Sequence, residues 1–208
     1  MRVLIADDHA VIRKGLKQIL IEEYPAVIIE EATDAEMAIQ KIITGNWDVI
    51  ITDLSMPGRS GLDILQHVKQ NGVKAPVLVL SVHPEEQYAV RVLKAGASGY
   101  LSKDAAQDEL VQAVQRVLLG RKYVSTSIAE KLILELDQPS NEKSPHELLS
   151  DREFDVFLLI AGGKTISDIA EKLSISITTV STYRARVLTK LNLKTNADIT
   201  RYAIENKL

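Results

Sequence analysis

Acidic residues, one serine and one lysine follow the apolar runs in the first half of the chain. Asp7 and Asp8 come directly after the first run and Asp53 directly after the third, while Ser81 follows the fourth and Lys103 lies two residues beyond the fifth. Carboxylate oxygens are preferred ligands of Mg²⁺, and such a cation neutralises and polarises an incoming phosphoryl group. An ammonium and a hydroxyl can hold phosphate oxygens. These residue types predict phosphoryl transfer, with Asp53 as the nucleophile that forms an aspartyl phosphate.

The apolar runs predict five strands that alternate with helices. The strands are rich in β-branched residues and do not alternate in polarity, as expected of strands buried on both faces: Val3–Ala6, Val27–Glu31, Val49–Thr52, Val77–Leu80 and Gly99–Leu101. Helical periodicity marks the intervening stretches: Ala10–Glu22, Ala35–Ile43, Leu62–Gln70, Glu85–Ala95 and Asp108–Leu119. We therefore predict an α/β fold with a five-stranded, doubly wound parallel sheet. In the strand order 2-1-3-4-5, the carboxylates converge at the carboxyl ends of neighbouring strands, where open α/β sheets bind ligands.

Two features of the predicted helices follow from the same pattern. The first helix has one apolar side, made of Val11, Leu16, Ile19 and Leu20. Glycines stand where four helices should end, in keeping with the access of glycine to the left-handed conformation: Gly45, Gly72, Gly96 and Gly120.

The pattern changes after residue 121. Residues 122–147 are predicted to be a partly helical linker, because a short helix at 125–136 precedes a polar stretch with two prolines. From Ser150 onward only helices are predicted: Asp151–Ala161, Ile166–Leu173, Ile177–Leu191 and Asn196–Asn206. S-x-x-E and T-x-x-D capping sequences introduce the first, second and fourth of them. The connection 174–176 is as short as a helix-turn-helix requires. Residues 148–208 thus form a separate all-α, four-helix domain in this interpretation.

Charge separates this last segment from the rest. The chain has a net charge of −3, yet residues 150–208 carry 9 basic and 7 acidic side chains, and residues 174–194 carry no acid. A local basic helix in an acidic protein indicates a polyanionic partner. One arc of the helix at 177–191 carries small side chains that could read base edges in a major groove: Thr178, Ser181, Thr182, Ala185 and Thr189.

Basic residues beside this arc are expected to bind phosphates. These are Arg186, Lys190 and Lys194, and we add Lys164 and Thr165 at the start of the preceding helix. Arg184 lies near the apolar side, so it must either reach outward to a phosphate or pair internally.

Composition excludes several classes of protein. The chain has no cysteine, so it can form neither a disulfide scaffold nor a thiolate metal site. No apolar run is long enough to cross a membrane, and two aspartates end the first run too early for a secretory signal. No histidine pair has metal-ligand spacing, and His9 and His83 are interpreted as cap and loop residues. We expect a soluble cytoplasmic protein without a membrane partner.

At its candidate catalytic residues the chain resembles the flavodoxin-like receiver domain of two-component response regulators. Four stretches in the same order carry the resemblance: DDH at 7–9, DLSMPGRSG at 53–61, LS at 80–81 and GYLSKD at 99–104. The resemblance implies a receiver domain at residues 1–121 with Asp53 as its phosphoacceptor. It also implies a Mg²⁺ site in which Asp8 and Asp53 bind directly, Asp7 binds through water and the Ser55 carbonyl is a further ligand.

The same resemblance assigns the remaining residues of the pocket. Lys103 and Ser81 assist the transfer, and Ser81 and Tyr100 hold the positions of the switch hydroxyl and the switch aromatic residue. Lys103 is followed by Asp104, where the family commonly has proline.

Residues 149–195 resemble the LuxR-type helix-turn-helix through L-S-x-R-E, I-A-G-G-K, I-A-x-x-L and I-S-x-x-T-V. Ser181 stands where many relatives have lysine, and Tyr183 where many have histidine. Together the halves resemble a response regulator of the NarL/FixJ type. This resemblance implies a sensor histidine kinase as phosphodonor, double-stranded DNA as target, and a homodimer of the phosphorylated chain that binds adjacent half-sites.

Several alternatives compete with this interpretation. A pair of aspartates after a strand often only caps a helix, and a lysine there is usually solvated, although the joint placement at four strand ends favours a site. A second possibility is a phosphorylation-independent DNA-binding regulator whose receiver is only an interaction module. A third is a phosphatase-like enzyme, which would need a second acid where Ser55 stands; we therefore expect no enzyme activity on a free substrate.

Overall fold

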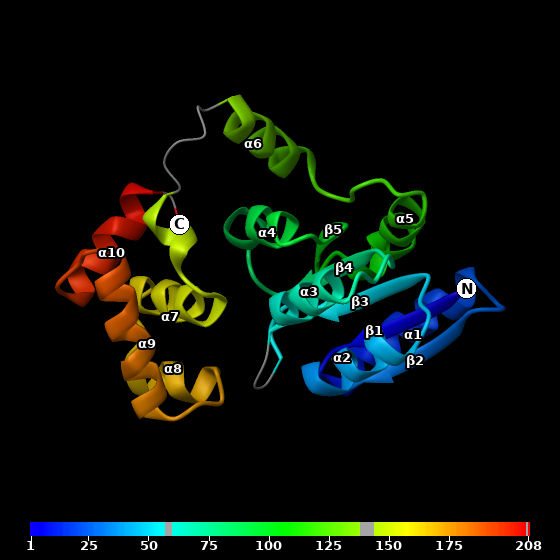
Figure 1. Cartoon of the computed structure of the whole chain (residues 1–208), viewed down its shortest axis with the longest axis horizontal. Coiled ribbons are helices and arrows are strands. Elements are labelled where there is room, and N and C mark those ends of the chain that lie inside the picture. The colour runs from blue at the N-terminus through cyan, green and yellow to red at the C-terminus, as the bar shows by residue number, and fades with distance from the viewer. Residues whose placement is uncertain (57–59, 138–143, 207) are drawn as a thin grey trace. The chain divides into compact units, whose positions relative to one another are not determined.

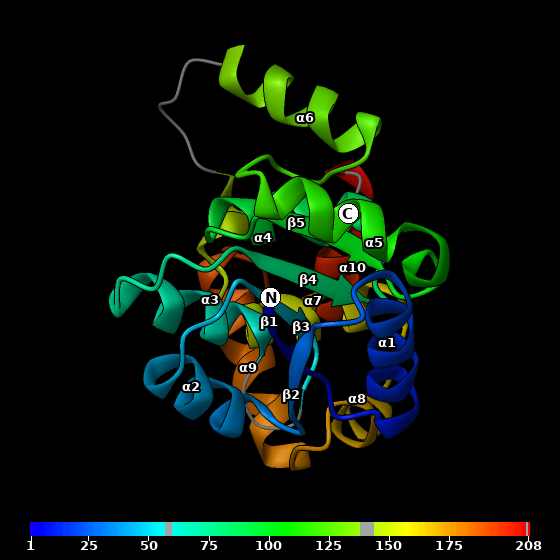
Figure 2. The ribbon, with the colours of Figure 1, turned by 90° about the vertical axis from the view of Figure 1, so that its right-hand side faces the viewer.

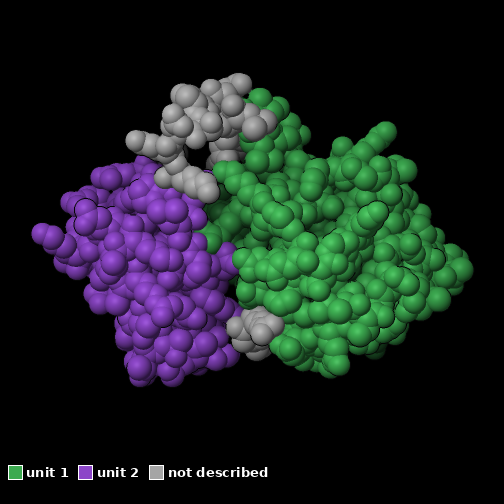
Figure 3. All heavy atoms as spheres, in the orientation of Figure 1, with its two compact units in different colours: residues 1–137 green, residues 138–208 purple. Residues whose placement is uncertain are grey.

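The computed structural model describes residues 1–56, 60–137, 144–206 and 208, which fall into two compact units, Met1–Asp137 and Gln138–Leu208 (Figure 3). The predicted linker is therefore divided. Residues 122–137 belong to the first unit, residues 138–143 lie outside the described part, and residues 144–147 open the second unit. Residues 57–59 of the motif at 53–61 also lie outside it. None of the helices in the described ranges has the length and apolarity needed to cross a membrane.

The first unit contains the predicted five-stranded parallel sheet in the order β2-β1-β3-β4-β5 (Figure 1). Each strand begins and ends within one residue of its predicted bounds: β1 (Arg2–Ala6), β2 (Ile28–Ala32), β3 (Val49–Asp53), β4 (Val77–Ser81) and β5 (Gly99–Ser102). The residues of β3 and β4 are buried throughout, as predicted. The expectation of burial on both faces is wrong for β2, where Ile28 is 57% exposed, because this strand forms an edge of the sheet.

Helices cover both faces of the sheet, with α1 and α5 on one face and α2, α3 and α4 on the other (Figure 2). The bounds of the helices in this unit are α1 (Ala10–Glu23), α2 (Ala35–Thr44), α3 (Gly61–Gln70), α4 (Glu85–Lys94), α5 (Ala106–Leu118) and α6 (Thr126–Asp137). Gly72, Gly96 and Gly120 have the predicted positive φ at helix ends. Gly45 does not: its φ is −109°, and a Cβ there would lie 2.9 Å from both the Lys41 carbonyl oxygen and the Trp47 ring.

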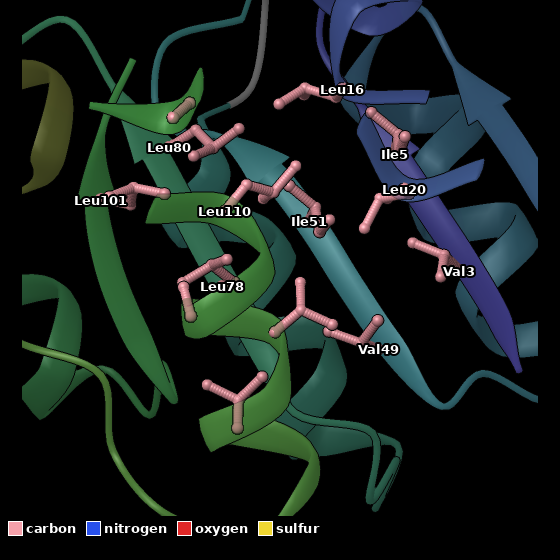
Figure 4. Close-up of a cluster of buried hydrophobic side chains, with 14 of the residues drawn as sticks. Val3, Ile5, Leu16, Leu20, Val49, Ile51, Leu78, Leu80, Leu101 and Leu110 are labelled. Carbon is pink, nitrogen blue, oxygen red and sulfur yellow. The ribbon is translucent and has the colours of Figure 1, made fainter. Parts of the chain in front are cut away.

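The core between the sheet and the α1–α5 layer is built from alternate residues of the inner strands. Its members include Val3, Ile5, Leu16, Leu20, Val49, Ile51, Leu78, Leu80, Leu101 and Leu110 (Figure 4). Val11 was expected on the apolar side of α1 but is 82% exposed. It lies on a different side of α1 from the core residues, since its neighbour Ile12 in the same turn packs against this core, as do Leu16 and Leu20.

The chain after α5 stays attached to the first unit. Tyr123 forms a parallel bridge with Gly99, and its carbonyl accepts a hydrogen bond from the Tyr100 amide at 3.1 Å, so it extends the β5 edge. Helix α6 then contacts α4, where Ile128 is buried and the Ser125 amide donates to the Glu85 carboxylate at 3.3 Å. The predicted helix in this region is thus part of the first unit.

The second unit is the predicted all-α domain, preceded by a short 3₁₀ helix. Its elements are η1 (Pro145–Leu148), α7 (Asp151–Ala161), α8 (Ile166–Lys172), α9 (Ile177–Lys190) and α10 (Asn196–Glu205). The three predicted capping boxes all form, at Ser150, Thr165 and Thr195. In the turn between α8 and α9, Ser174 adopts a φ of 53°, and α7 packs against both α9 and α10.

Candidate functional site

Lys103 joins two carboxylates at the carboxyl ends of the central strands. Its ammonium nitrogen lies 2.7 Å from Asp7 Oδ2 and 2.7 Å from Asp53 Oδ2. Both aspartates are buried, and the Lys103 side chain is only 6% exposed. The predicted convergence of Asp7, Asp53 and Lys103 is therefore present, and the ion pairs within it are shielded from solvent.

Main-chain contacts fix these groups on the sheet. The Asp7 amide donates to the Ala32 carbonyl at 3.1 Å, and the Lys103 amide donates to the Ser81 carbonyl at 2.8 Å. Gly61, the first residue of α3, lies against Asp53, since a Cβ at this glycine would approach the Asp53 carbonyl oxygen to 2.5 Å. Gly61 is thus required for close backbone contact beside Asp53, which its sequence context alone does not distinguish from the role of a loop glycine.

The pKa values of Asp53 and Lys103 are shifted in directions that agree with one cation facing two buried carboxylates. Burial raises the pKa of Asp53, an effect that the Lys103 ammonium offsets only in part. Burial alone would lower the pKa of Lys103, but its hydrogen bonds to Asp53 and Asp7 outweigh burial and raise it. Lys103 therefore holds its proton, and the negative charge of the pocket is not fully neutralised.

The pocket has the donor set of a site for a hard divalent cation. Ligand atoms of Asp7, Asp8, His9 and Asp53 all lie within 4.8 Å of one another. Asp7 Oδ2 and Asp8 Oδ1 are buried oxygens that accept no hydrogen bond of good geometry in the described structure. Their neighbours are Lys103 for Asp7 and the His9 ring, 2.8 Å away, for Asp8. Three clustered carboxylates beside a single ammonium fit a hard divalent cation such as Mg²⁺.

The Ser81 and Tyr100 side chains lie beside this pocket and are both buried. The Tyr100 hydroxyl donates to the His83 carbonyl at 2.9 Å, and burial raises the Tyr100 pKa to about 12. The Ser81 hydroxyl accepts a hydrogen bond from the His83 amide at 3.0 Å. Ser55 donates its amide to Asp53 Oδ1 at 3.2 Å, and its hydroxyl lies 2.9 Å from His83 Nε2.

Sequence reasoning missed the roles of both loop histidines. His9 was interpreted as a helix cap, and it does precede α1, but its ring also contacts both Asp7 and Asp8. His83 was interpreted as a plain loop residue, yet it contacts Ser55, Ser81 and Tyr100. The one signal that could have indicated this is the position of His83, two residues after a strand whose end carries Ser81.

In the second unit, α9 presents the predicted polar arc to solvent. Ser176 caps the helix by accepting the Thr179 amide, and Val180 and Val187 anchor its opposite side in the core. The members of the arc are exposed: Thr178, Ser181, Thr182, Ala185, Arg186 and Thr189. Helix α9 therefore offers small polar groups and one arginine on its exposed arc, and its own sequence contains no acidic residue.

Three basic residues assigned to phosphates have different surroundings. Lys190 is paired internally, with its ammonium 2.6 Å from Glu153 Oε2 and 3.1 Å from the Leu148 carbonyl. Arg184 takes the internal alternative and donates to Asn196 Oδ1 at 2.6 Å. Lys164 is exposed, and the neighbouring Thr165 caps α8. Phosphate contacts by these residues remain predictions. Lys190 and Arg184 would have to bind a phosphate while they keep, or give up, their bonds to Glu153 and Asn196.

Comparison with known proteins identifies both units. Residues 3–115 match the response regulator receiver domain, and residues 147–203 match the bacterial regulatory proteins of the luxR family. Response regulator UvrY of Escherichia coli is 35% identical over 208 residues, which cover all of this chain and 95% of UvrY. Oxygen regulatory protein NreC of Staphylococcus epidermidis is 37% identical over 215 aligned residues, which cover all of this chain and 99% of NreC.

A solved structure agrees with this assignment. RcsB of Salmonella enterica serovar Typhimurium, bound to the promoter rprA in the presence of a beryllofluoride phosphomimetic, aligns over 97% of both chains with a TM-score of 0.63 and 26% identity. The chain therefore belongs to the two-component response regulators, in the NarL/FixJ group that joins a receiver domain to a LuxR-type DNA-binding domain.

Proposed function

We propose that this chain is phosphorylated on Asp53 by a sensor histidine kinase and that phosphorylation controls its binding to double-stranded DNA. The observation that carries the proposal is the Lys103 ammonium, which lies 2.7 Å from both Asp7 and Asp53 in a buried pocket. A structural ion pair would need only one carboxylate. Two carboxylates around one ammonium, with Asp8 beside them, leave a net negative charge that suits a divalent cation and a phosphoryl donor.

The residues of the pocket have distinct tasks in the transfer. An oxygen of Asp53 attacks the phosphorus of a phosphohistidine, the P–N bond breaks, and the departing imidazole takes up a proton. Asp8, Asp53 and the Ser55 carbonyl would hold Mg²⁺, with Asp7 bound through water, and the cation supplies charge neutralisation for the phosphoryl oxygens. Lys103 and the Ser81 hydroxyl donate hydrogen bonds to the same oxygens.

The output follows from the second unit. We infer that α9 enters the major groove, with Ser181 and Thr182 at base edges and Arg186 at a phosphate. The DNA complex of the RcsB relative supports this assignment, as does the exposure of the polar arc. The phosphorylated chain would bind as a homodimer, since paired half-sites require two recognition helices.

The test separates this proposal from a regulator whose receiver is not phosphorylated. The protein is incubated with a small phosphodonor, such as phosphoramidate, with Mg²⁺ or with EDTA, and its intact mass is measured. We expect a mass increase of one phosphoryl group that needs Mg²⁺ and is abolished in Asp53→Asn. A full-length protein that gains no Asp53-dependent mass, yet binds DNA with unchanged affinity, would favour the phosphorylation-independent regulator. Sustained turnover of a free phosphoester would instead indicate an enzyme.

A further inference from the structure

His83 connects the loop after β3 to the loop after β4. Its ring Nε2 lies 2.9 Å from the hydroxyl of Ser55, the residue whose amide holds Asp53 Oδ1 at 3.2 Å. The sequence separation between His83 and Ser55 is 28 residues, so the contact joins two separate loops at the mouth of the pocket. Any shift of the Ser55 loop therefore acts on the His83 ring.

The main chain of His83 holds both residues of the switch. Its amide donates to the Ser81 hydroxyl at 3.0 Å, and the Ser81 hydroxyl also interacts with the Tyr100 side chain. Its carbonyl accepts the Tyr100 hydroxyl at 2.9 Å, and Tyr100 is 1% exposed. The position of this one backbone segment thus bears on both Ser81 and Tyr100.

The ring of His83 is fixed from its other side by α4. It stacks on Tyr88 with ring centroids 4.6 Å apart and an interplanar angle of 26°, and Tyr88 is buried. His83 is thus held by stacking on α4, by a side-chain hydrogen bond to Ser55 and by main-chain hydrogen bonds to Ser81 and Tyr100. It cannot move relative to one of these partners without straining its contacts with the others.

We propose that His83 is a positioning residue that couples the Ser55 loop beside Asp53 to the Ser81–Tyr100 switch. The proposal rests on the proposed function, because it names the contact through which a group bound at Asp53 biases Tyr100. In this arrangement the His83–Ser55 hydrogen bond and the Tyr100–His83 hydrogen bond support each other, so loss of either weakens the other. The coupling depends on the hydrogen bond between His83 Nε2 and Ser55, since the main-chain hydrogen bonds of His83 to Ser81 and Tyr100 do not reach Ser55.

A double-mutant cycle tests this coupling in the full-length chain. The dissociation constant of beryllofluoride, a phosphoryl mimic, is measured by ¹⁹F NMR at saturating Mg²⁺ for the wild type, Ser55→Ala, Tyr100→Phe and the double variant. Since each change removes one hydrogen bond, we expect each single variant to bind about fivefold more weakly. The double variant should also bind only about five- to tenfold more weakly, instead of showing the roughly 25-fold product expected of independent sites.

The same cycle is repeated in three backgrounds. In His83→Phe, which keeps a ring to stack on Tyr88 but removes the bond to Ser55, the effects of the two substitutions should multiply. In His83→Gln, whose amide can replace Nε2, they should again be less than multiplicative. His67→Phe is the matched control, because this histidine lies on α3 and its Nδ1 bonds to the Asp63 carbonyl instead. Trp47 fluorescence during urea unfolding confirms that each variant is folded.

The outcomes distinguish this proposal from the function on which it depends. Multiplicative effects in the wild-type background would overturn the role of His83, as would non-additivity that survives in His83→Phe. Both outcomes would leave Asp53-dependent binding intact. If beryllofluoride binds equally well to Asp53→Ala, the proposed function fails and the role of His83 with it.

Discussion

Replacement of Lys103 by methionine would leave Asp7 and Asp53 facing each other without a cation. Methionine keeps most of the volume of the lysine stem, so the change removes charge rather than packing. Removal of one partner from a buried ion pair typically costs about 3–5 kcal/mol. We place Lys103→Met in this range at pH 7 in the absence of divalent cations, because both carboxylates are buried and both lose their 2.7 Å contact.

The chain offers a specific probe for this measurement. Trp47 is the only tryptophan in the sequence, and it lies in the first unit, where its Nε1 donates to the Lys41 carbonyl at 3.0 Å. Its fluorescence during urea unfolding therefore reports on the receiver unit alone. With an m-value of about 2 kcal/mol/M, the expected loss lowers the urea midpoint by about 1.5–2.5 M. Lys17→Met is the control, since Lys17 pairs with Glu31 at the surface and such pairs contribute about 1 kcal/mol or less.

The pH dependence gives the stricter test. The Asp53 pKa is already raised by burial from its ordinary value of 3.8, and removal of Lys103 should raise it further. A carboxyl whose pKa is higher in the folded state contributes most stability below its unfolded pKa and loses that contribution as pH rises through the folded pKa. The deficit of Lys103→Met should therefore shrink toward pH 4 and grow toward pH 7, and Mg²⁺ should reduce it at pH 7. A deficit below 1 kcal/mol at pH 7, or one that is independent of pH, would refute the assignment of the pocket as one cation holding two charged carboxylates.

Three further predictions concern the other parts of the chain. Burial opposes ionisation of Glu153, but bonds from Lys190 and Ser150 outweigh it and lower its pKa. The contribution of Glu153 to the free energy of unfolding should be present above its ordinary pKa of 4.5 and be lost as pH falls through the lower folded value. Glu153→Gln should lower the free energy of unfolding of the second unit by about 1–3 kcal/mol at pH 7, as measured by calorimetry. Ile128→Ala should weaken the packing of α6 against α4 by about 2–5 kcal/mol and make α6 cleavable by limited proteolysis. Unchanged protection of α6 would show that Ile128 does not anchor the helix. Arg186→Ala should weaken binding to all DNA sequences and reduce the salt slope by about 1, whereas Ser181→Ala should change sequence preference, both read by fluorescence anisotropy.

The parts of the molecule that could be predicted from sequence are those set by local pattern and by sheet geometry. Lys103 and Asp53 are 50 residues apart, yet their meeting follows from the fact that each lies at or just beyond the carboxyl end of a strand in one parallel sheet. The caps at Ser150 and Thr165 follow from the identity of the residues three positions later. In both cases a repeating geometry converts position in the sequence into position in space.

The features that escaped prediction depend on side-chain contacts between separate segments. Lys190 has the composition and position of a phosphate ligand, and only the fold reveals Glu153 as its partner, 37 residues away. Gly45 has the context of a left-handed helix end, but the close Lys41 carbonyl and Trp47 ring, not the backbone angle, exclude a side chain there. Ile128 lies in a stretch that is expected to be a linker, and its burial depends on where α4 runs. Periodicity carries no information on such pairs.

This division has a physical consequence for signalling. A group placed by the sheet, such as Asp53, is held by ladder hydrogen bonds and by a closely packed core, and such interiors resist small displacements. A group placed by contacts between loops, such as His83, is held by a few hydrogen bonds that each contribute about 1 kcal/mol. A bound phosphoryl group can shift a two-state equilibrium only by the difference in its interaction with the two states, typically a few kcal/mol. That is enough to rearrange the loop contacts around Ser55, His83 and Tyr100, and too little to move the strands. Asp53 and the loop residue His83 are therefore held by different kinds of contact, and the sequence is informative about the first kind for the same reason that the second kind can respond.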